Sequence, residues 1–94
     1  MNKEIVVGFD VDGTLIDEKN NPIYRNINLL LDFHSRGCCV IVASGGGQSY
    51  TESIVNKLGL SDIVECFTKT NLPYMPDIWF DDQDCSIGSV NIRI

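Results

Sequence analysis

Two aspartates, Asp10 and Asp12, stand one residue apart in the run Asp10-Val11-Asp12-Gly13-Thr14. Carboxylates with this spacing, placed just after a strand, can divide the work of phosphoryl transfer. Asp10 would attack phosphorus, while Asp12 would protonate the leaving oxygen and then activate water against the aspartyl-phosphate. Gly13 would let the backbone turn sharply so that both carboxylates face one point, and we count it among the substrate-binding positions.

A second pair of carboxylates, Asp81-Asp82, ends another apolar run near the C-terminus. Together with Asp10 these side chains would supply the hard oxygen ligands that Mg²⁺ prefers. A divalent cation would also reverse the local potential, so that an acidic protein can receive a phosphate. The sequence leaves open which of the two aspartates is the direct ligand, and we favour Asp82.

The remaining phosphate-binding groups are expected after two other apolar runs. Ser44 can donate its hydroxyl, and the backbone N–H groups of Gly45 and Gly46 can donate at the mouth of the next helix. A cation is also needed, and Lys69 is preferred to Lys57 because Lys57 falls late in a helix, away from the other groups. We therefore predict catalytic and substrate-binding roles for both Ser44 and Lys69.

Each of these polar groups follows a short apolar run, which is typical of buried parallel strands. Strands are predicted over residues 4–9, 38–43, 63–67, 77–80 and 90–94. Because the carboxyl ends of parallel strands meet at one edge of a sheet, groups that are far apart in the sequence would converge there. The polar segment 14–24 between the first strand and the first helix reads as a loop or small flap.

Two helices are expected between the first three strands. The first would be capped by Asn26 and stopped by Gly37, and the second would begin with the capping-box residues Ser49 and Glu52 and stop at Gly59. The buried stripe of the first would consist of Ile27, Leu30, Leu31 and His34. That of the second would consist of Tyr50, Ile54, Val55 and Leu58. Alternating strands and helices predict an α/β fold with a mainly parallel sheet of about five strands.

This pattern resembles the haloacid dehalogenase-like (HAD) superfamily, which is known for Rossmann-like phosphatases that work through an aspartyl-phosphate. Its first motif, hhhDxDGT with h apolar, matches residues 5–14, and its second, an apolar strand ending in Ser or Thr, matches residues 40–44. Lys69 matches its lone lysine, and residues 78–82 match its final strand with paired aspartates. The resemblance implies that the metal is bound by Asp10, the backbone carbonyl of Asp12, and Asp81 or Asp82.

Members of this superfamily normally carry a cap domain inserted after the first or third motif, and the intervals here are too short for one. We therefore expect residues 1–94 to form a single capless domain, a minimal Rossmann-like fold with three layers or an incomplete two-layer fold. Its crevice would be open and would admit a phosphorylated small molecule or macromolecule.

Chain connectivity predicts that one face of the sheet has no helix. Right-handed crossovers place both expected helices on the same face. Segment 69–76 contains two prolines, and segment 83–88 is too short for a parallel crossover, so neither can cover the other face. We expect a second copy of the chain or a partner protein to bury this bare face, and we expect residues 89–94 to pair as an antiparallel or edge strand.

The composition is that of one soluble globular domain, with 94 residues, 44% hydrophobic and 21% charged. A formal net charge of −6 argues against high affinity for nucleic acid or an anionic membrane. We expect no signal peptide and no membrane span, because the apolar runs are short. The four cysteines lack the paired spacing of a zinc site and are expected to be reduced, which favours a cytoplasmic location.

Two functions other than a Mg²⁺-dependent phosphomonoesterase are compatible with some of these residues. One is a phosphate- or metal-binding interaction module that kept the fold but lost turnover, and the intact acids Asp10, Asp12 and Asp82 argue against it. The other is a phospho-accepting signalling domain, whose acceptor lies on a later strand. The phosphatase is the hypothesis that accounts for all four motifs.

Overall fold

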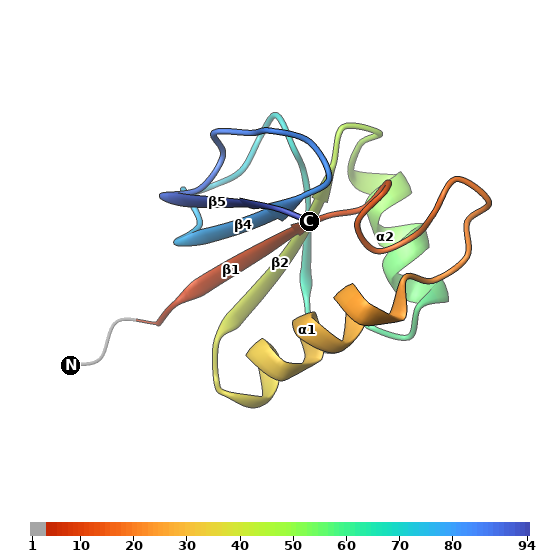
Figure 1. The fold of residues 1–94 in the computed structure, drawn as a ribbon, viewed down its shortest axis with the longest axis horizontal. Helices are drawn as coiled ribbons and strands as arrows, with labels where there is room; N and C mark the ends of the chain where they lie inside the picture. The colour runs from red at the N-terminus through yellow and green to blue at the C-terminus, as the bar shows by residue number, and fades with distance from the viewer. Residues whose placement is uncertain (1–3) are drawn as a thin grey trace.

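A five-stranded sheet with the strand order β3-β2-β1-β4-β5 organises the chain, and all four pairings in it are parallel (Figure 1). The computed structural model describes residues 4–94. Its elements are β1 (Val6–Asp10), α1 (Tyr24–Ser35), β2 (Cys39–Ser44), α2 (Gln48–Lys57), β3 (Glu65–Thr68), β4 (Ile78–Asp81) and β5 (Val90–Arg93). This confirms the predicted α/β fold, and no cap domain interrupts the described residues.

Strand β1 lies at the centre of the sheet and determines where the polar residues meet. It pairs with β2 in the register Asp10↔Ala43 and with β4 in the register Phe9↔Phe80. Ser44 and Asp81 each follow a residue paired with β1, so they flank Asp10 at the same edge. The three central strands are almost completely buried, as their continuous apolar sequences predict.

Both helices pack on one face of the sheet, as the right-handed crossovers predict (Figure 1). The apolar core lies between this face and the helices, and the rings of Phe9 and Phe80 stack within it with their centroids 4.9 Å apart. The helices contribute Ile27, Leu30, Ile54 and Val55. No helix in the described part of the chain is long and apolar enough to cross a membrane.

The buried side of α1 differs from the predicted stripe. Leu31 is 38% exposed and His34 is exposed, whereas Phe33 packs against the core and its ring lies 5.8 Å from that of Phe80. Asn26 is not the cap, because the helix already begins at Tyr24. The Asn26 side chain is buried instead, and its Nδ2 donates to the Thr14 carbonyl at 2.8 Å.

The predicted capping box of α2 is also wrong. Gly47, with φ of 102°, turns the chain so that the helix begins at Gln48 and Ser49 falls inside its first turn. Gln48 Nε2 donates to Glu52 Oε2 at 3.1 Å and to the Cys66 carbonyl at 2.7 Å. The first turn of α2 is therefore tied to β3 by a side chain.

The other face of the sheet has no helix, as predicted, but it is not bare. Ile41 and Trp79 on this face are fully buried. The Trp79 indole lies directly on Gly8, where an added Cβ would be 2.5 Å from Trp79 Cε3. The segments before and after β4 arch over this side in Figure 1, and the Phe67 and Tyr74 rings meet edge to face. Trp79 and the two loops before and after β4 therefore cover this face of the sheet in place of helices.

Strand β5 is an edge strand, as predicted, but it runs parallel to β4 rather than antiparallel. The assumption that the connection is too short for a parallel crossover was wrong. Strands of four residues are only about 13 Å long, and the eight residues 82–89 can return over that distance without a helix. Asn91 tightens the return, because its Oδ1 accepts from the N–H groups of Ile87 and Gly88.

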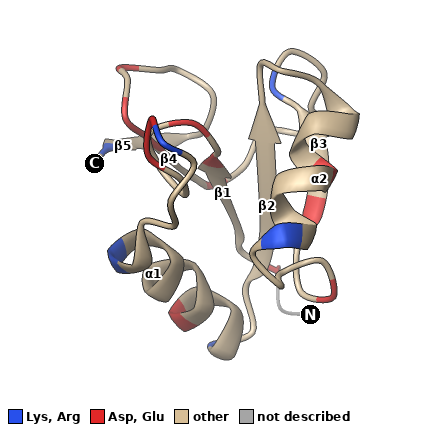
Figure 2. Cartoon of the chain, turned by 90° about the vertical axis from the view of Figure 1, so that its right-hand side faces the viewer, with Lys and Arg blue, Asp and Glu red and all other residues tan. Residues whose placement is uncertain are grey.

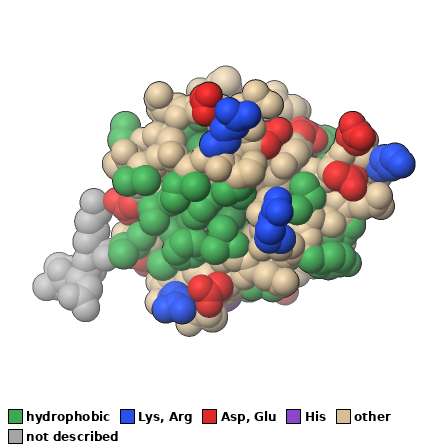
Figure 3. All heavy atoms as spheres, viewed as in Figure 1, with side chains coloured by type: hydrophobic (Ala, Val, Ile, Leu, Met, Phe, Trp, Pro, Cys, Tyr) green, Lys and Arg blue, Asp and Glu red, His purple; other side chains and the backbone are tan. Residues whose placement is uncertain are grey.

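An exposed apolar surface does occur, but on the face that carries the helices. This surface consists of Ile78 on β4 and of Val90 and Ile92 on β5, whose side chains lie side by side in the β4–β5 register. Helix α1 does not cover them, and Val90 is 53% and Ile92 39% exposed. Figure 3 shows hydrophobic side chains gathered on this face. The homo-oligomer expected from the sequence stays a prediction, and this surface rather than the Trp79 face is available to it.

The contact between Gly8 and Trp79 gives a first prediction. Gly8→Ala should lower the free energy of unfolding by about 1–3 kcal/mol, because the new methyl group would overlap the buried indole. Gly45→Ala is the matched control, because an added Cβ there meets nothing within 4 Å. Urea denaturation measures both, and equal stability of the two variants would contradict the packing described.

Candidate active site

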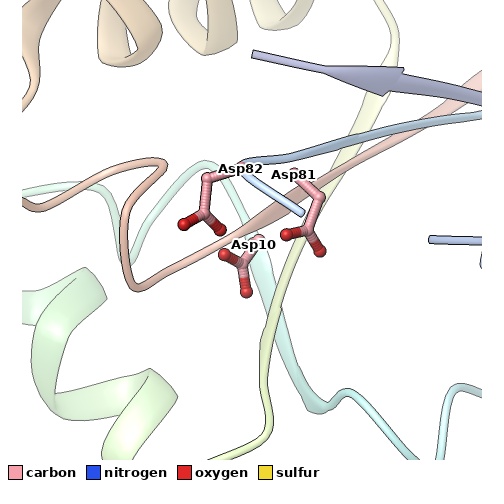
Figure 4. Close-up of side chains that lie close together, drawn as sticks. All are labelled: Asp10, Asp81 and Asp82. Atoms are coloured by element: carbon pink, nitrogen blue, oxygen red, sulfur yellow. The ribbon is translucent and has the colours of Figure 1, made fainter. Parts of the chain in front are cut away.

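Three carboxylates meet at the carboxyl edge of the sheet. Asp10 ends β1, Asp81 ends β4 and Asp82 follows it, and oxygens of all three lie within 4.8 Å of one another. Figure 4 shows the three side chains pointing toward a common centre, and acidic residues are seen around the ends of β1 and β4 in Figure 2. Asp10 and Asp81 are buried, so their charges are poorly screened by water.

Lys69 is the cation of this cluster. Its Nζ lies 2.9 Å from Asp10 Oδ1 and 2.8 Å from Asp81 Oδ2, and its side chain is 23% exposed. The backbone N–H of Lys69 donates to the Ser44 carbonyl at 3.0 Å, which attaches the segment after β3 to the end of β2. The structure therefore brings Lys69 to the site, while Lys57 lies in the last turn of α2.

The charges of the cluster shift one another's ionisation. Burial raises the pKa of Asp10 to about 6, although the hydrogen bond and charge of Lys69 oppose this. Burial alone would raise the pKa of Asp81 as well, but hydrogen bonds from Lys69, Trp79 and Gln83 outweigh it and hold that pKa well below its usual range. Burial would lower the pKa of Lys69, but its bonds to Asp81 and Asp10 raise it, so the ammonium stays charged.

Asp81 is contacted by four protein donors. Its Oδ2 accepts from Trp79 Nε1 at 2.9 Å and from Cys85 Sγ at 3.1 Å in addition to Lys69, and its Oδ1 accepts from the Gln83 N–H at 3.0 Å. Three donors therefore meet Oδ2 and one meets Oδ1, so Asp81 is more heavily hydrogen-bonded than Asp82. Asp81 therefore holds Lys69 in place.

Asp82 has a different environment. Apart from its contact with Asp10, it accepts within the described residues a single long hydrogen bond, from Gln83 Nε2 at 3.5 Å. Its carboxylate lies against the backbone of Gly13, where an added Cβ would be 2.1 Å from Asp82 Oδ2. Gly13 has φ of 82° and leaves room for this carboxylate. Asp82 thus reaches the centre of the cluster with its oxygens available.

Asp12 lies on the exposed turn after β1, and its carboxylate is outside the acidic group. Its Oδ1 accepts a hydrogen bond of 2.6 Å from Tyr50 Oη on α2. The turn is closed by a bond from the Gly13 N–H to the Ile16 carbonyl at 2.8 Å. The carboxylate of Asp12 is therefore held by Tyr50 and is not part of the group formed by Asp10, Asp81 and Asp82.

Two residues of the site were not assigned a role from the sequence. Thr14 is buried and its Oγ1 lies 3.2 Å from Asp10 Oδ2, so it fixes the oxygen that Lys69 does not hold. Its place in the DxDGT run was a signal for it. Tyr50 was placed on the apolar stripe of α2, and no local pattern indicates that its hydroxyl reaches Asp12.

Ser44 ends β2 beside the end of β1, and the glycines follow it directly. Ser44 is buried, and its Oγ accepts from the Gly46 N–H at 3.0 Å. Gly45 and Gly46 are exposed and lie just before the first turn of α2. A phosphate oxygen could take over the Gly46 N–H and accept from the Ser44 hydroxyl, because helix N-termini favour anions.

The site opens into a depression with a volume of about 770 Å³. It is lined by Asp12, Gly13, Asp82, Ile23 and the turn 17–21. Asp17 Oδ1 accepts from the N–H groups of Lys19 and Asn21 and so holds the turn in shape. This turn is the small flap predicted over residues 14–24, and it leaves the crevice open.

The donor set fits a hard divalent cation. All three side chains that converge are carboxylates, and within the described residues they form the one group of acidic, histidine or cysteine side chains compact enough to hold an ion. The four cysteines are free thiols. An all-oxygen set of this kind is typical of Mg²⁺, whereas zinc sites usually include thiolates or imidazoles.

Comparison with known proteins agrees with the geometry. A family model described as haloacid dehalogenase-like hydrolase matches residues 7–70, which include Asp10, Asp12, Ser44 and Lys69. Searches of curated proteins and of solved structures found no match. Asp81 and Asp82 follow the matched segment, and β4 places them beside Asp10. The chain belongs to the family of haloacid dehalogenase-like hydrolases.

Proposed function

We propose that the protein is a Mg²⁺-dependent phosphatase that hydrolyses phosphomonoesters through an aspartyl-phosphate on Asp10. The observation that supports this most strongly is the setting of Asp10. Its carboxylate is buried and held by Thr14 on one oxygen and Lys69 on the other, and it faces the available carboxylate of Asp82. A nucleophile held in this way is oriented before substrate arrives.

In the first step an oxygen of Asp10 attacks phosphorus. A bond from that oxygen to phosphorus forms while the bond to the leaving oxygen breaks, and Asp12 gives its proton to the leaving alcohol. Lys69 neutralises charge on the phosphoryl oxygens. The Ser44 hydroxyl and the N–H groups of Gly45 and Gly46, before the first turn of α2, bind the same oxygens.

In the second step Asp12, now ionised, removes a proton from water, and the water oxygen attacks phosphorus. The bond between phosphorus and Asp10 breaks, inorganic phosphate leaves and the Asp10 carboxylate is restored. The exposed position of Asp12 suits this exchange, because its carboxylate can meet both the leaving alcohol and incoming water.

Mg²⁺ would be held by Asp10, Asp82 and the backbone carbonyl of Asp12, and when bound it supplies positive charge that offsets the phosphate and the carboxylates. We assign Asp81 to Lys69 instead, because Asp81 accepts four contacts from protein donors whereas Asp82 accepts one long hydrogen bond. The open depression suits a phosphorylated macromolecule as well as a small molecule, and we propose that the enzyme works in the cytoplasm.

Turnover of 4-nitrophenyl phosphate with Mg²⁺ tests this function directly. EDTA should abolish it, and Asp10→Asn should lower kcat at least about a thousandfold, because the nucleophile is lost. Asp32→Asn, on the exposed surface of α1, is the matched control and should keep full activity. Absence of turnover in the wild-type protein at every Mg²⁺ concentration would support the alternative, a binding module without catalysis.

Substitution of Asp81 and of Asp82 tests which of the two binds the metal and which binds Lys69. Asp82→Asn should remove the rise in melting temperature that MgCl₂ gives the wild-type protein, because a ligand is lost. Asp81→Asn should keep that rise but start from lower stability, by about 1–3 kcal/mol, because Lys69 loses a buried partner. Differential scanning fluorimetry measures both, and the reverse pattern would reassign the metal ligand to Asp81.

The raised pKa of Asp10 predicts how stability depends on pH without metal. A carboxyl whose folded pKa is about 6, above its unfolded value, destabilises the fold as pH rises from about 4 through 6. In EDTA, Asp10→Asn should therefore be more stable than wild type at pH 8, by about 1–3 kcal/mol, and equal to it near pH 4. Denaturation curves with a constant difference at both pH values would contradict the raised pKa.

A further inference from the structure

Tyr50 contacts Asp12 from a neighbouring element of the fold. Its Oη lies 2.6 Å from Asp12 Oδ1, although the two residues are 38 positions apart. A distance this short marks a well-formed hydrogen bond between two oxygens. The bond fixes Oδ1 of Asp12 and leaves Oδ2 to carry and transfer a proton.

The ring of Tyr50 is itself held in place. It lies on the backbone of Gly46, where an added Cβ would be 2.8 Å from Tyr50 Cδ2. Its Cα is fixed in the first turn of α2, which Gln48 ties to β3. The ring and the helix therefore hold the hydroxyl in the position from which it donates to Asp12 Oδ1.

Asp12 needs such a contact because of where it lies. It is exposed, on a turn that borders an open depression, and it stands outside the buried cluster of Lys69, Asp10 and Asp81. An exposed aspartate on a turn would otherwise exchange between side-chain rotamers. General acid catalysis requires the carboxyl group to be within hydrogen-bond reach of the leaving oxygen.

We propose that Tyr50 is a positioning residue that holds the Asp12 carboxylate for proton transfer, and so joins the phosphate-binding loop at Gly46 to the general acid. This rests on the proposed phosphatase function. It gives Tyr50 a role that its place on an amphipathic helix does not require, because packing alone would be served equally by phenylalanine.

Tyr50→Phe isolates the hydroxyl, since the ring and its contact with Gly46 are kept. The proposal predicts a loss that depends on the leaving group. Catalytic efficiency, kcat/KM, should fall about tenfold for alkyl phosphates, whose leaving oxygen needs a proton, and stay within about twofold for 4-nitrophenyl phosphate, whose leaving group needs none. Tyr24→Phe, 67% exposed on α1, is the matched control and should leave both values unchanged.

A double-mutant cycle tests whether Tyr50 acts through Asp12. In an Asp12→Asn background, Tyr50→Phe should cause no further loss with alkyl phosphates, because the group it holds is already disabled. Equal losses with both substrates, or fully additive losses in the cycle, would overturn the proposal. A wild-type protein that turns over neither substrate would instead refute the proposed function itself.

A second measurement does not depend on the folding of Tyr50→Phe. The chain has three tyrosines, so labelling with 3-fluorotyrosine gives three ¹⁹F NMR signals. Asp12→Ala should shift the signal of Tyr50 and leave those of Tyr24 and Tyr74 in place. An unchanged spectrum would show that the hydrogen bond is absent in solution and would overturn the proposal.

Discussion

Lys69 stands between two buried carboxylates, and the geometry of the site depends on that bridge. Its Nζ binds Asp10 and Asp81 at 2.9 and 2.8 Å. Burying two carboxylates without a cation would cost several kcal/mol per charge, because the interior screens poorly and water is excluded. The three aspartates of the cluster still outnumber the single ammonium. A divalent cation bound at this site would offset the excess negative charge.

The bridge is supported from the helix-free face of the sheet. Gly8 has no side chain and so leaves space on β1 for the Trp79 indole to pack against it. Trp79 and Asp81 are two residues apart on β4 and so point to the same face, which lets the indole N–H donate to the carboxylate. Packing of an apolar ring thereby fixes Asp81, which fixes Lys69, which orients Asp10. In this small protein the packing of Trp79 thus both fills the helix-free face of the sheet and helps to orient Asp10.

The central part of this arrangement could be predicted from the sequence because it follows from short-range rules. Apolar runs ending in Asp10, Ser44 and Asp81 predict parallel strands, and parallel strands place their carboxyl ends together. The parallel direction of β5 and the cover over Ile41 could not be predicted in the same way. Both depend on how loops and one tryptophan fill space, which no periodicity records.

The roles of individual side chains within the site also depend on three-dimensional contacts that the sequence does not reveal. The choice between Asp81 and Asp82 depends on which carboxylate meets Trp79, Cys85 and Lys69, and adjacent residues in a sequence do not reveal this. The contact of Tyr50 with Asp12 depends on the angle between α2 and the turn after β1. The helical period of α2 correctly predicted the helix but not the direction of the phenol.

The central claim is that Asp10 accepts the phosphoryl group. Trapping during turnover tests it most directly, because sodium borohydride reduces an acyl phosphate to an alcohol and converts the aspartate to homoserine. Peptide mass spectrometry should then find homoserine at position 10, only when substrate and Mg²⁺ are both present, and not in Asp10→Asn. An enzyme that turns over substrate while Asp10 stays unmodified, or that is reduced at another aspartate, would contradict the account.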